Sequence, residues 1–298
     1  MSFSAQVKRE LCRLPIQKRC CAKAEAYGIL LFCNSFHTGE IKIITESEAL
    51  ARRLPTLFWK AFRLELDSQI EGREGGKFLL SITAPEKLKT IFETYDQDPR
   101  GTLALHLNFG VLEEECCKVS FCRGAFLGGG SVTDPEKGYH LELVTAHYAV
   151  SRELPALLHE VGFEGKNAVR KSNYVTYFKQ SEGIEDFLTA LGAPVAAMDV
   201  MSAKVEKHLR NGVNRRVNCD AANLDKAVDA AQEHLAAIRR LEERGLLDSL
   251  PDKLRQTARL REENRSSTLT QLAELCSPPI SKSALNHRLR KLVELSNA

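Results

Sequence analysis

The sequence lacks any run of 18 consecutive apolar residues, so we expect no membrane-spanning helix. Its first residues, MSFSAQVKRELCRL, mix charged and apolar side chains from the start and lack the apolar core of a secretory signal. The nine cysteines are an odd number and include two adjacent pairs, which argues against a disulfide framework. These absences exclude membrane proteins and disulfide-stapled secreted proteins, and they predict a cytoplasmic protein with reduced thiols.

The cysteines also lack the usual pattern of a zinc site, which shows Cys-x-x-Cys pairs or histidine partners at short spacing. Cys116, Cys117 and Cys122 come nearest to such a pattern. We interpret the cysteines as reduced, half-buried thiols. The sequence therefore predicts no metal and no cofactor.

The sequence has no large excess of charge of either sign. It contains 42 Lys and Arg and 39 Asp and Glu, which gives a net charge of +3. The distribution is uneven. Residues 253–298 carry nine Lys or Arg and four Glu, whereas the other 252 residues carry 33 basic and 35 acidic side chains. A length of 298 residues fits two or three domains, so the basic character belongs to one end of the chain.

What the sequence does contain is an internal repeat. Residues 28–36 align with residues 124–132 at an offset of 96, and residues 53–57 align with 153–157 at an offset of 100. Pro55 and Pro155 recur in the second pair, and we expect each to lie in the first turn of a helix. Strand-like or amphipathic helical runs complete both copies, at 41–44, 77–83 and 86–94 in the first and at 139–144, 174–179 and 183–191 in the second.

Two units, at about 23–96 and 119–194, therefore read helix–strand–strand–helix–strand–strand–helix. We expect them to pair about a pseudo-twofold axis, which buries their leading helices against each other. Small residues allow such close approach, and they are present as Gly124, Gly128, Gly129 and Gly130. A phosphate-binding loop would instead follow a strand and open a helix, so we interpret these glycines as the end of a helix.

Residues 121–132, FCRGAFLGGGSV, resemble a degenerate LAGLIDADG motif, the signature of a family of homing endonucleases. The resemblance implies a duplicated αββαββα domain and places the metal-binding acids of the nucleases at Cys33 and Gly129. Neither residue is a carboxylate, and Asp134 lies beyond the helix in an expected hairpin turn with Pro135 and Gly138. Hard cations need oxygen ligands, so we expect no catalytic residue and no metal here.

Residues 201–222 form a basic linker in this interpretation. Five basic side chains and one acid lie within 204–216, together with amides that can donate to backbone phosphates. The alternative is a solvated charged face. The expected phosphate contacts are Lys204, Lys207, Arg210, Asn214, Arg215 and Arg216.

The last part of the chain, 223–298, is expected to be all-helical. Apolar residues recur at helical spacing from Leu224 to Leu241, and Gly245 is a typical helix stop. Another helix is expected to start at 249–251 and to break at 264–267. Two shorter helices follow, at 269–276 and 282–295, with Ser281 as the N-cap of the second. The pattern is that of a helix-turn-helix.

The final helix has the features of a recognition helix, which presents its N-terminal outer residues to the major groove. Leu285, Leu289 and Leu292 form its core side. Asn286 could bind adenine, and Arg290 or Arg288 guanine or phosphate. The alternative is an exposed basic helix in an ordinary bundle. The expected DNA contacts are Lys282, Ser283, Asn286, His287, Arg288 and Arg290.

The order of these parts, with the stretch HLRNGVNRRVNCDAANLDKAVDAA at 208–231, resembles the WhiA family from end to end. The resemblance implies the following domains: an N-terminal helical segment at 1–22, the duplicated LAGLIDADG-like domain at 23–200, the basic linker and the helix-turn-helix domain. It implies a non-enzymatic bacterial transcription regulator tied to sporulation and cell division, located on the nucleoid. The expected partners are double-stranded DNA and RNA polymerase, a sigma factor or another regulator.

Two points stay open. The duplicated domain could add a second DNA surface, or it could sense a protein or a small ligand. The competing functions are a metal-dependent endonuclease and an adaptor that binds protein. The residues of the second DNA surface would be Arg170, Lys171, Tyr174, Tyr177 and Lys179, on strands that face DNA in the nuclease scaffold.

Overall fold

The computed structural model describes residues 2–70, 76–98 and 104–298. The chain forms two compact units, one running through His208 and one beginning at Leu209. Each unit has its own hydrophobic core. We describe them separately.

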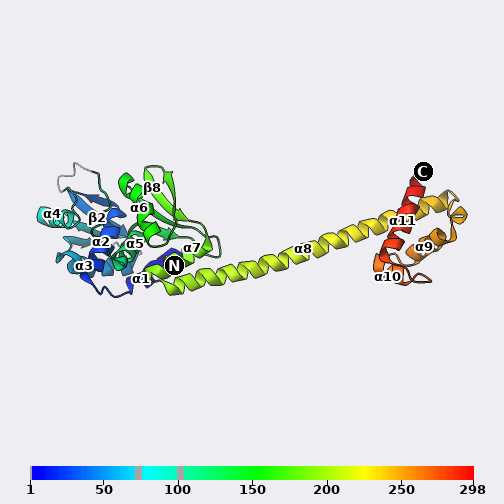
Figure 1. Cartoon of the computed structure of the whole chain (residues 1–298), viewed down its shortest axis with the longest axis horizontal. Coiled ribbons are helices and arrows are strands. Elements are labelled where there is room, and N and C mark those ends of the chain that lie inside the picture. Colours follow the sequence, from blue (N-terminus) through cyan, green and yellow to red (C-terminus); the bar gives the residue numbers. More distant parts are fainter. Residues whose placement is uncertain (1, 71–75, 99–103) are drawn as a thin grey trace. The chain divides into compact units, whose positions relative to one another are not determined.

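The first unit contains both repeats, and each repeat has the expected αββαββα order (Figure 1). A short helix, α1 (Phe3–Cys12), precedes them and buries Val7 and Leu11 in the same core. The first repeat consists of α2 (Arg19–Leu31), β1 (Ser35–His37), β2 (Glu40–Thr45), α3 (Glu48–Phe62), β3 (Ser68–Ile70), β4 (Phe78–Ile82) and α4 (Pro85–Thr94). The second consists of α5 (Glu115–Gly129), β5 (Gly130–Val132), β6 (Leu141–Thr145), α6 (Tyr148–Glu160), β7 (Lys166–Arg170), β8 (Asn173–Phe178) and α7 (Ser181–Leu191).

The two sheets have the same topology. The strand order is β1-β2-β4-β3 in the first and β5-β6-β8-β7 in the second, with all neighbouring strands antiparallel. Their central strand pairs match as well: Ile43 lies opposite Leu80, and Leu143 lies opposite Thr176. The duplicated α+β fold expected from the sequence is confirmed.

The leading helices α2 and α5 lie side by side between the two sheets (Figure 1). Glycines bring their backbones together: a β-carbon on Gly28 would lie 2.2 Å from the Phe121 carbonyl oxygen, and one on Gly128 would lie 2.9 Å from that of Ile29. Gly130 differs from the expectation. A β-carbon there would meet Phe126 of its own helix, because Gly130 has already left α5 and begins β5.

The expected position of the two prolines is wrong. Pro55 and Pro155 lie inside helices that begin at Glu48 and Tyr148, not in their first turns. A proline inside a helix cannot donate to the carbonyl four residues earlier. In α6 that carbonyl belongs to Ser151, and the Asn167 side-chain amide donates to it at 3.2 Å. The neighbouring strand thus satisfies the acceptor that the proline leaves free.

A single helix, α8 (Pro194–Glu243), follows the second repeat and passes through the boundary between the units. Its first turn is held by α1, because the Glu10 carboxylate accepts from the backbone amides of Val195 and Ala196 at 2.8 and 3.0 Å. A carboxylate at a helix N-terminus is favoured by the helix dipole. The residues that we described as a linker, 201–222, are therefore helical throughout.

The second unit is all-helical, as expected. After α8 the chain reverses at Gly245, which has the positive φ of +64° that glycine tolerates. A short 3-10 turn (Leu247–Ser249) leads to α9 (Asp252–Glu263), α10 (Leu269–Glu274) and α11 (Lys282–Asn297). The core of this unit joins the end of α8 to all three helices and contains Ile238, Leu241, Ala258, Leu272, Ala273, Leu285, Leu289 and Leu292.

Candidate nucleic-acid interface

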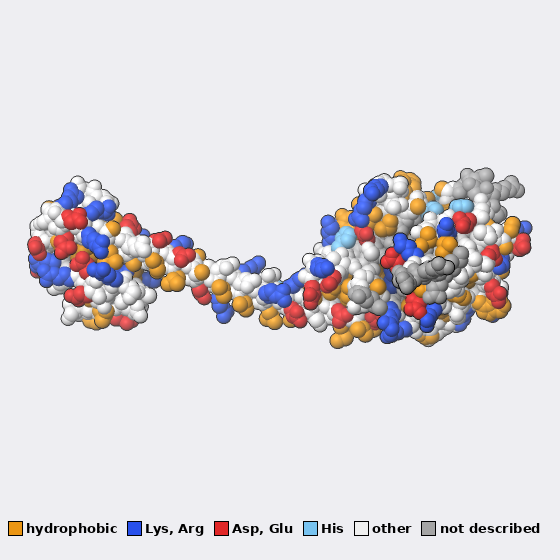
Figure 2. Space-filling view, turned by 180° about the vertical axis from the view of Figure 1, so that it is seen from behind, with side chains coloured by type: hydrophobic (Ala, Val, Ile, Leu, Met, Phe, Trp, Pro, Cys, Tyr) orange, Lys and Arg blue, Asp and Glu red, His pale blue; other side chains and the backbone are white. Residues whose placement is uncertain are grey.

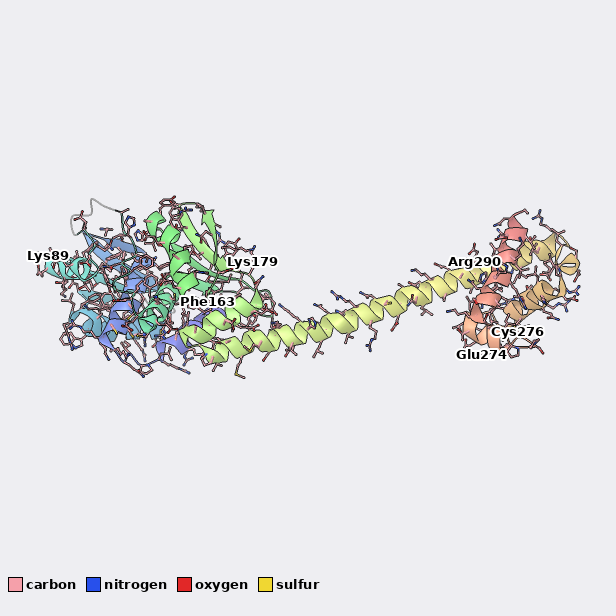
Figure 3. The ribbon with its side chains drawn as sticks, viewed as in Figure 1. Lys89, Phe163, Lys179, Glu274, Cys276 and Arg290 are labelled. Carbon is pink, nitrogen blue, oxygen red and sulfur yellow. The ribbon has the colours of Figure 1, made fainter. Side chains whose placement is uncertain are left out.

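Helix α11 separates an apolar side from a polar one. Leu285, Leu289 and Leu292 are buried, as predicted. At roughly 100° per residue, the polar residues lie within one arc on the opposite side. Of these, Ser283, His287 and Arg290 are exposed and Asn286 is half-buried. The helix therefore presents one continuous polar face, which includes Arg290 (labelled in Figure 3).

Two further residues of α11, Lys282 and Arg288, were predicted to contact DNA, and they lie at different positions around the helix. Lys282 is exposed in the first turn, beside the polar face. Arg288 lies well outside the arc of the polar face and is half-buried. In the part of the chain that the structure describes, Lys282 and Arg290 form no ion pair, whereas the nearby Lys291 pairs with Glu294 at 3.0 Å. The charges of Lys282 and Arg290 are therefore available to a ligand.

Capping interactions fix the helices around this face. The Ser281 hydroxyl accepts from the Ala284 amide at 3.2 Å, as expected for the N-cap of α11. Thr268 and Gln271 form a capping box at the start of α10. The far end of α11 is bound to α8 by Arg240, which donates to the Ser296 hydroxyl at 3.1 Å. The helix is therefore positioned at both ends.

The structure divides the basic stretch of α8 into two groups. Lys204 forms ion pairs with Glu182 and Glu185 of α7. Lys207 donates to the Pro135 carbonyl at 2.7 Å, and its ammonium lies 4.6 Å from the Tyr139 ring centroid. The other members of the stretch are exposed and available to phosphates: Arg210, Asn214, Arg215 and Arg216.

An apolar row also runs along this part of α8. Val205, Leu209, Val213 and Val217 follow at every fourth residue, and each is 58–66% exposed. Residues four apart lie on one side of a helix, but Arg216 falls within the same arc as this row. This part of α8 therefore carries exposed apolar and basic side chains together on its surface (Figure 2).

The second sheet offers a weaker basic surface than expected. Arg170 donates to both Glu142 carboxylate oxygens, at 3.3 and 3.0 Å. Partial burial raises the pKa of Glu142, but hydrogen bonds from His140 and Arg170 outweigh this effect and hold it below its ordinary value. Glu142 is thus a stable anion that neutralises Arg170. Lys171 lies in the turn between β7 and β8, where it is exposed and has a positive φ of 56°.

Tyr174 and Tyr177 do not share a face of this sheet. Residues three apart on a strand point to opposite sides. Tyr174 lies against Tyr148 of α6, with ring centroids 5.4 Å apart, and so belongs to the helix-covered face. Tyr177 lies on the open face, where the Lys179 ammonium is 5.2 Å from its ring centroid. Tyr174 is therefore removed from the expected second DNA surface.

The nuclease positions cannot hold a metal. A β-carbon on Gly129 would lie 2.3 Å from the Val144 carbonyl oxygen and 2.8 Å from that of Phe32, so a carboxylate side chain has no room there. Cys33 donates its thiol to backbone carbonyls of Leu30 and Ser35, and burial raises its pKa to about 12. A protonated thiol and a glycine do not fit the hard cation of a LAGLIDADG nuclease.

Sequence reasoning missed one cluster, which consists of Cys20, Cys21, Cys116 and Cys117. Their four Sγ atoms all lie within 4.8 Å of one another. A signal was present in the repeat itself, because the two pairs are separated by the same 96 residues as Gly28 and Gly124. All nine cysteines are unpaired in the structure.

Comparison with known proteins identifies the family. Residues 118–210 match the sequence model of the WhiA LAGLIDADG-like domain, and residues 213–296 match that of the WhiA C-terminal HTH domain. A protein from Alkaliphilus metalliredigens is 37% identical over 310 residues, which cover 100% of this chain and 98% of the relative. The chain belongs to the WhiA family.

Other WhiA proteins are similar over their whole length. The relative from Bacillus licheniformis is 35% identical, over 99% of this chain and 96% of its own, and both relatives carry the name probable cell division protein WhiA. The crystal structure of full-length WhiA from Thermotoga maritima matches with a TM-score of 0.61 at 23% identity, covering 100% of this chain and 98% of that one. The WhiA fold is thus confirmed, and its HTH domain suggests DNA binding.

No helix within the described residues is long and apolar enough to cross a membrane.

Proposed function

We propose that this WhiA protein is a sequence-specific DNA-binding transcription regulator that acts in cell division and sporulation and does not cleave DNA. One observation carries the proposal. The polar face of α11, made of Ser283, Asn286, His287 and Arg290, lies opposite a buried leucine side on a helix that is fixed at both ends. This is the arrangement that a recognition helix needs in the major groove.

The side chains on this face suit base readout. The amide of Asn286 can form a bidentate pair with adenine, and the guanidinium of Arg290 can form one with guanine. Lys282, exposed in the first turn of α11, is assigned a phosphate contact at the groove edge. Arg288 points elsewhere and is assigned no base.

The exposed part of α8 adds affinity without specificity. Arg210, Arg215 and Arg216 lie in a stretch of α8 that is exposed from 208 to 229, so they can neutralise phosphates in a salt-dependent manner. Lys204 and Lys207 bond to other residues of the first unit, to which they belong, and are assigned a structural role. A protein partner at RNA polymerase, a sigma factor or another regulator would complete the transcriptional function on the nucleoid.

The experiment is to map chromosome occupancy and transcript levels in the native host. The wild-type chain is compared with Asn286→Ala plus Arg290→Ala, and with the charge-matched surface change Arg239→Ala. The proposal expects discrete occupied promoters whose transcripts change when the double substitution removes the occupancy, and no effect of Arg239→Ala. Occupancy that survives the double substitution would instead indicate an adaptor recruited through protein contacts.

A further inference from the structure

The cysteine cluster lies where the two motif helices begin. Cys20 and Cys21 are the second and third residues of α2, and Cys116 and Cys117 are the second and third residues of α5. The pseudo-twofold pairing of α2 with α5 brings the two pairs together from distant parts of the chain. Cys20 is exposed, Cys117 is buried, and the other two are intermediate.

The distances match those of a single bound ion. A zinc–sulfur bond is about 2.3 Å long, so four thiolates around one tetrahedral zinc lie about 3.8 Å from one another. In the cluster all four sulfurs lie within 4.8 Å of one another, and Cys20 Sγ is 4.0 Å from Cys21 Sγ. A small contraction of the four side chains would close the set around one ion.

We propose that Cys20, Cys21, Cys116 and Cys117 bind one zinc ion, which fastens the N-terminal ends of the two motif helices to each other. The inference revises the expectation of no metal and does not rest on the proposed DNA-binding function.

The chemistry of the ligand set favours zinc. Four thiolates are a soft, closed set without an open coordination position, as in structural zinc sites. An iron–sulfur cluster also uses four cysteines, but its sulfides lie between the irons and hold the thiolates further apart. Both cysteine pairs lie in first helical turns, where the helix dipole favours thiolates.

Two thiols of the cluster have pKa values shifted in opposite directions. Burial raises the pKa of Cys117 well above its ordinary value. Slight burial raises that of Cys20, but hydrogen bonds from Cys117, Cys21 and Cys116 hold it below its ordinary value. Zinc binds the deprotonated form, so loading the site near neutral pH releases protons that a weakly buffered titration detects.

The test uses the full chain, purified anaerobically without chelator. We expect about one zinc per chain by elemental analysis. When cobalt replaces the zinc, we expect the charge-transfer and d–d absorption bands of a tetrahedral cobalt thiolate site.

Zinc removal should lower the unfolding temperature of the first unit, which the fluorescence of the single tryptophan, Trp59 of α3, reports. Cys20→Ser and Cys116→Ser should lose the zinc, whereas Cys219→Ser, an exposed cysteine of α8, should keep it.

Several results would overturn the proposal. One is reduced wild-type protein that shows neither stoichiometric zinc nor cobalt thiolate bands, and this result does not depend on any variant folding. Others are zinc content that Cys20→Ser and Cys116→Ser leave unchanged, or a disulfide within the cluster of the anaerobically purified protein. DNA binding of the zinc-free chain, measured in parallel, keeps failure of the metal site separate from failure of the proposed function.

Discussion

Gly124 of α5 lies directly against the backbone of Glu25 of α2: a β-carbon on Gly124 would stand 2.0 Å from the Glu25 carbonyl oxygen. This contact sets the distance between the two repeats. It also brings the Glu25 side chain into the interior of the first unit, where its carboxylate is paired with Arg53 and Arg123.

We expect Gly124→Ala to destabilise the first unit by about 1–3 kcal/mol or more, because the added methyl group meets rigid backbone and the helices must separate. Denaturant unfolding followed by Trp59 fluorescence measures the loss. Gly183→Ala is the matched control: nothing lies within 4 Å of its β-carbon position in α7, so it should be neutral or slightly stabilising. Equal stability of both variants would contradict the close contact.

Glu25→Ala should cost about 3–5 kcal/mol of unfolding free energy, because it leaves the buried Arg53 guanidinium without its carboxylate. The two groups meet at 2.6 and 3.0 Å, with side chains 5% and 2% exposed. Glu48→Ala breaks a pair with Arg52 whose side chains are 77% and 58% exposed, and should cost at most about 1 kcal/mol. The same tryptophan signal compares them.

The fold could be predicted from the sequence because the residues that mark its repeat are compatible with few local structures. The glycines at offset 96 allow close helix pairing, and the periodic leucines of α11 define a buried side. Pro55 and Pro155 misled the prediction because local preference places proline early in a helix. Here the tertiary structure tolerates it later, with Asn167 satisfying one freed carbonyl.

The site was predictable only in part, because the missing information lies in contacts between distant segments. From the sequence, the charge of Lys207 predicts a phosphate contact. In the structure its ammonium instead contacts the Pro135 carbonyl and the Tyr139 ring. Arg170 is neutralised by Glu142 across the sheet. The four cysteines become one cluster only when the two helices are paired. Each case depends on long-range packing that short spacing rules do not contain.

The second unit should lose stability on acidification. Burial and the nearby Arg261 charge lower the pKa of His234 below its usual 6.5, although Glu233 opposes them. The unfolded chain therefore takes up a proton near pH 6.5 before the folded one does, and stability falls as pH drops below that value. Hydrogen exchange of α9–α11 should show this loss in the wild type and in His287→Ala, and a smaller one in His234→Leu. An identical pH dependence in His234→Leu would exclude this histidine as the cause.

Supercoiled plasmid incubated with the protein and magnesium should remain intact, because neither Cys33 nor Gly129 offers an oxygen ligand. The substitutions Cys33→Asp and Gly129→Asp together should not create cleavage either, since Val144 and Phe32 carbonyls fill the space beside residue 129. Agarose electrophoresis checks both. Cleavage that a chelator abolishes would restore the nuclease hypothesis.

The most direct test of base reading by α11 begins with a duplex that the wild-type protein selects from a random pool. The affinity of the full chain for this duplex is then compared with its affinity for a scrambled duplex at several salt concentrations. We predict that Asn286→Ala and Arg290→Ala each reduce this preference by about 1–3 kcal/mol, whereas the salt-dependent binding to scrambled DNA is retained. Arg239→Ala should leave the preference unchanged. Failure to enrich any sequence, or an unchanged preference in the Asn286 and Arg290 variants, would contradict the account.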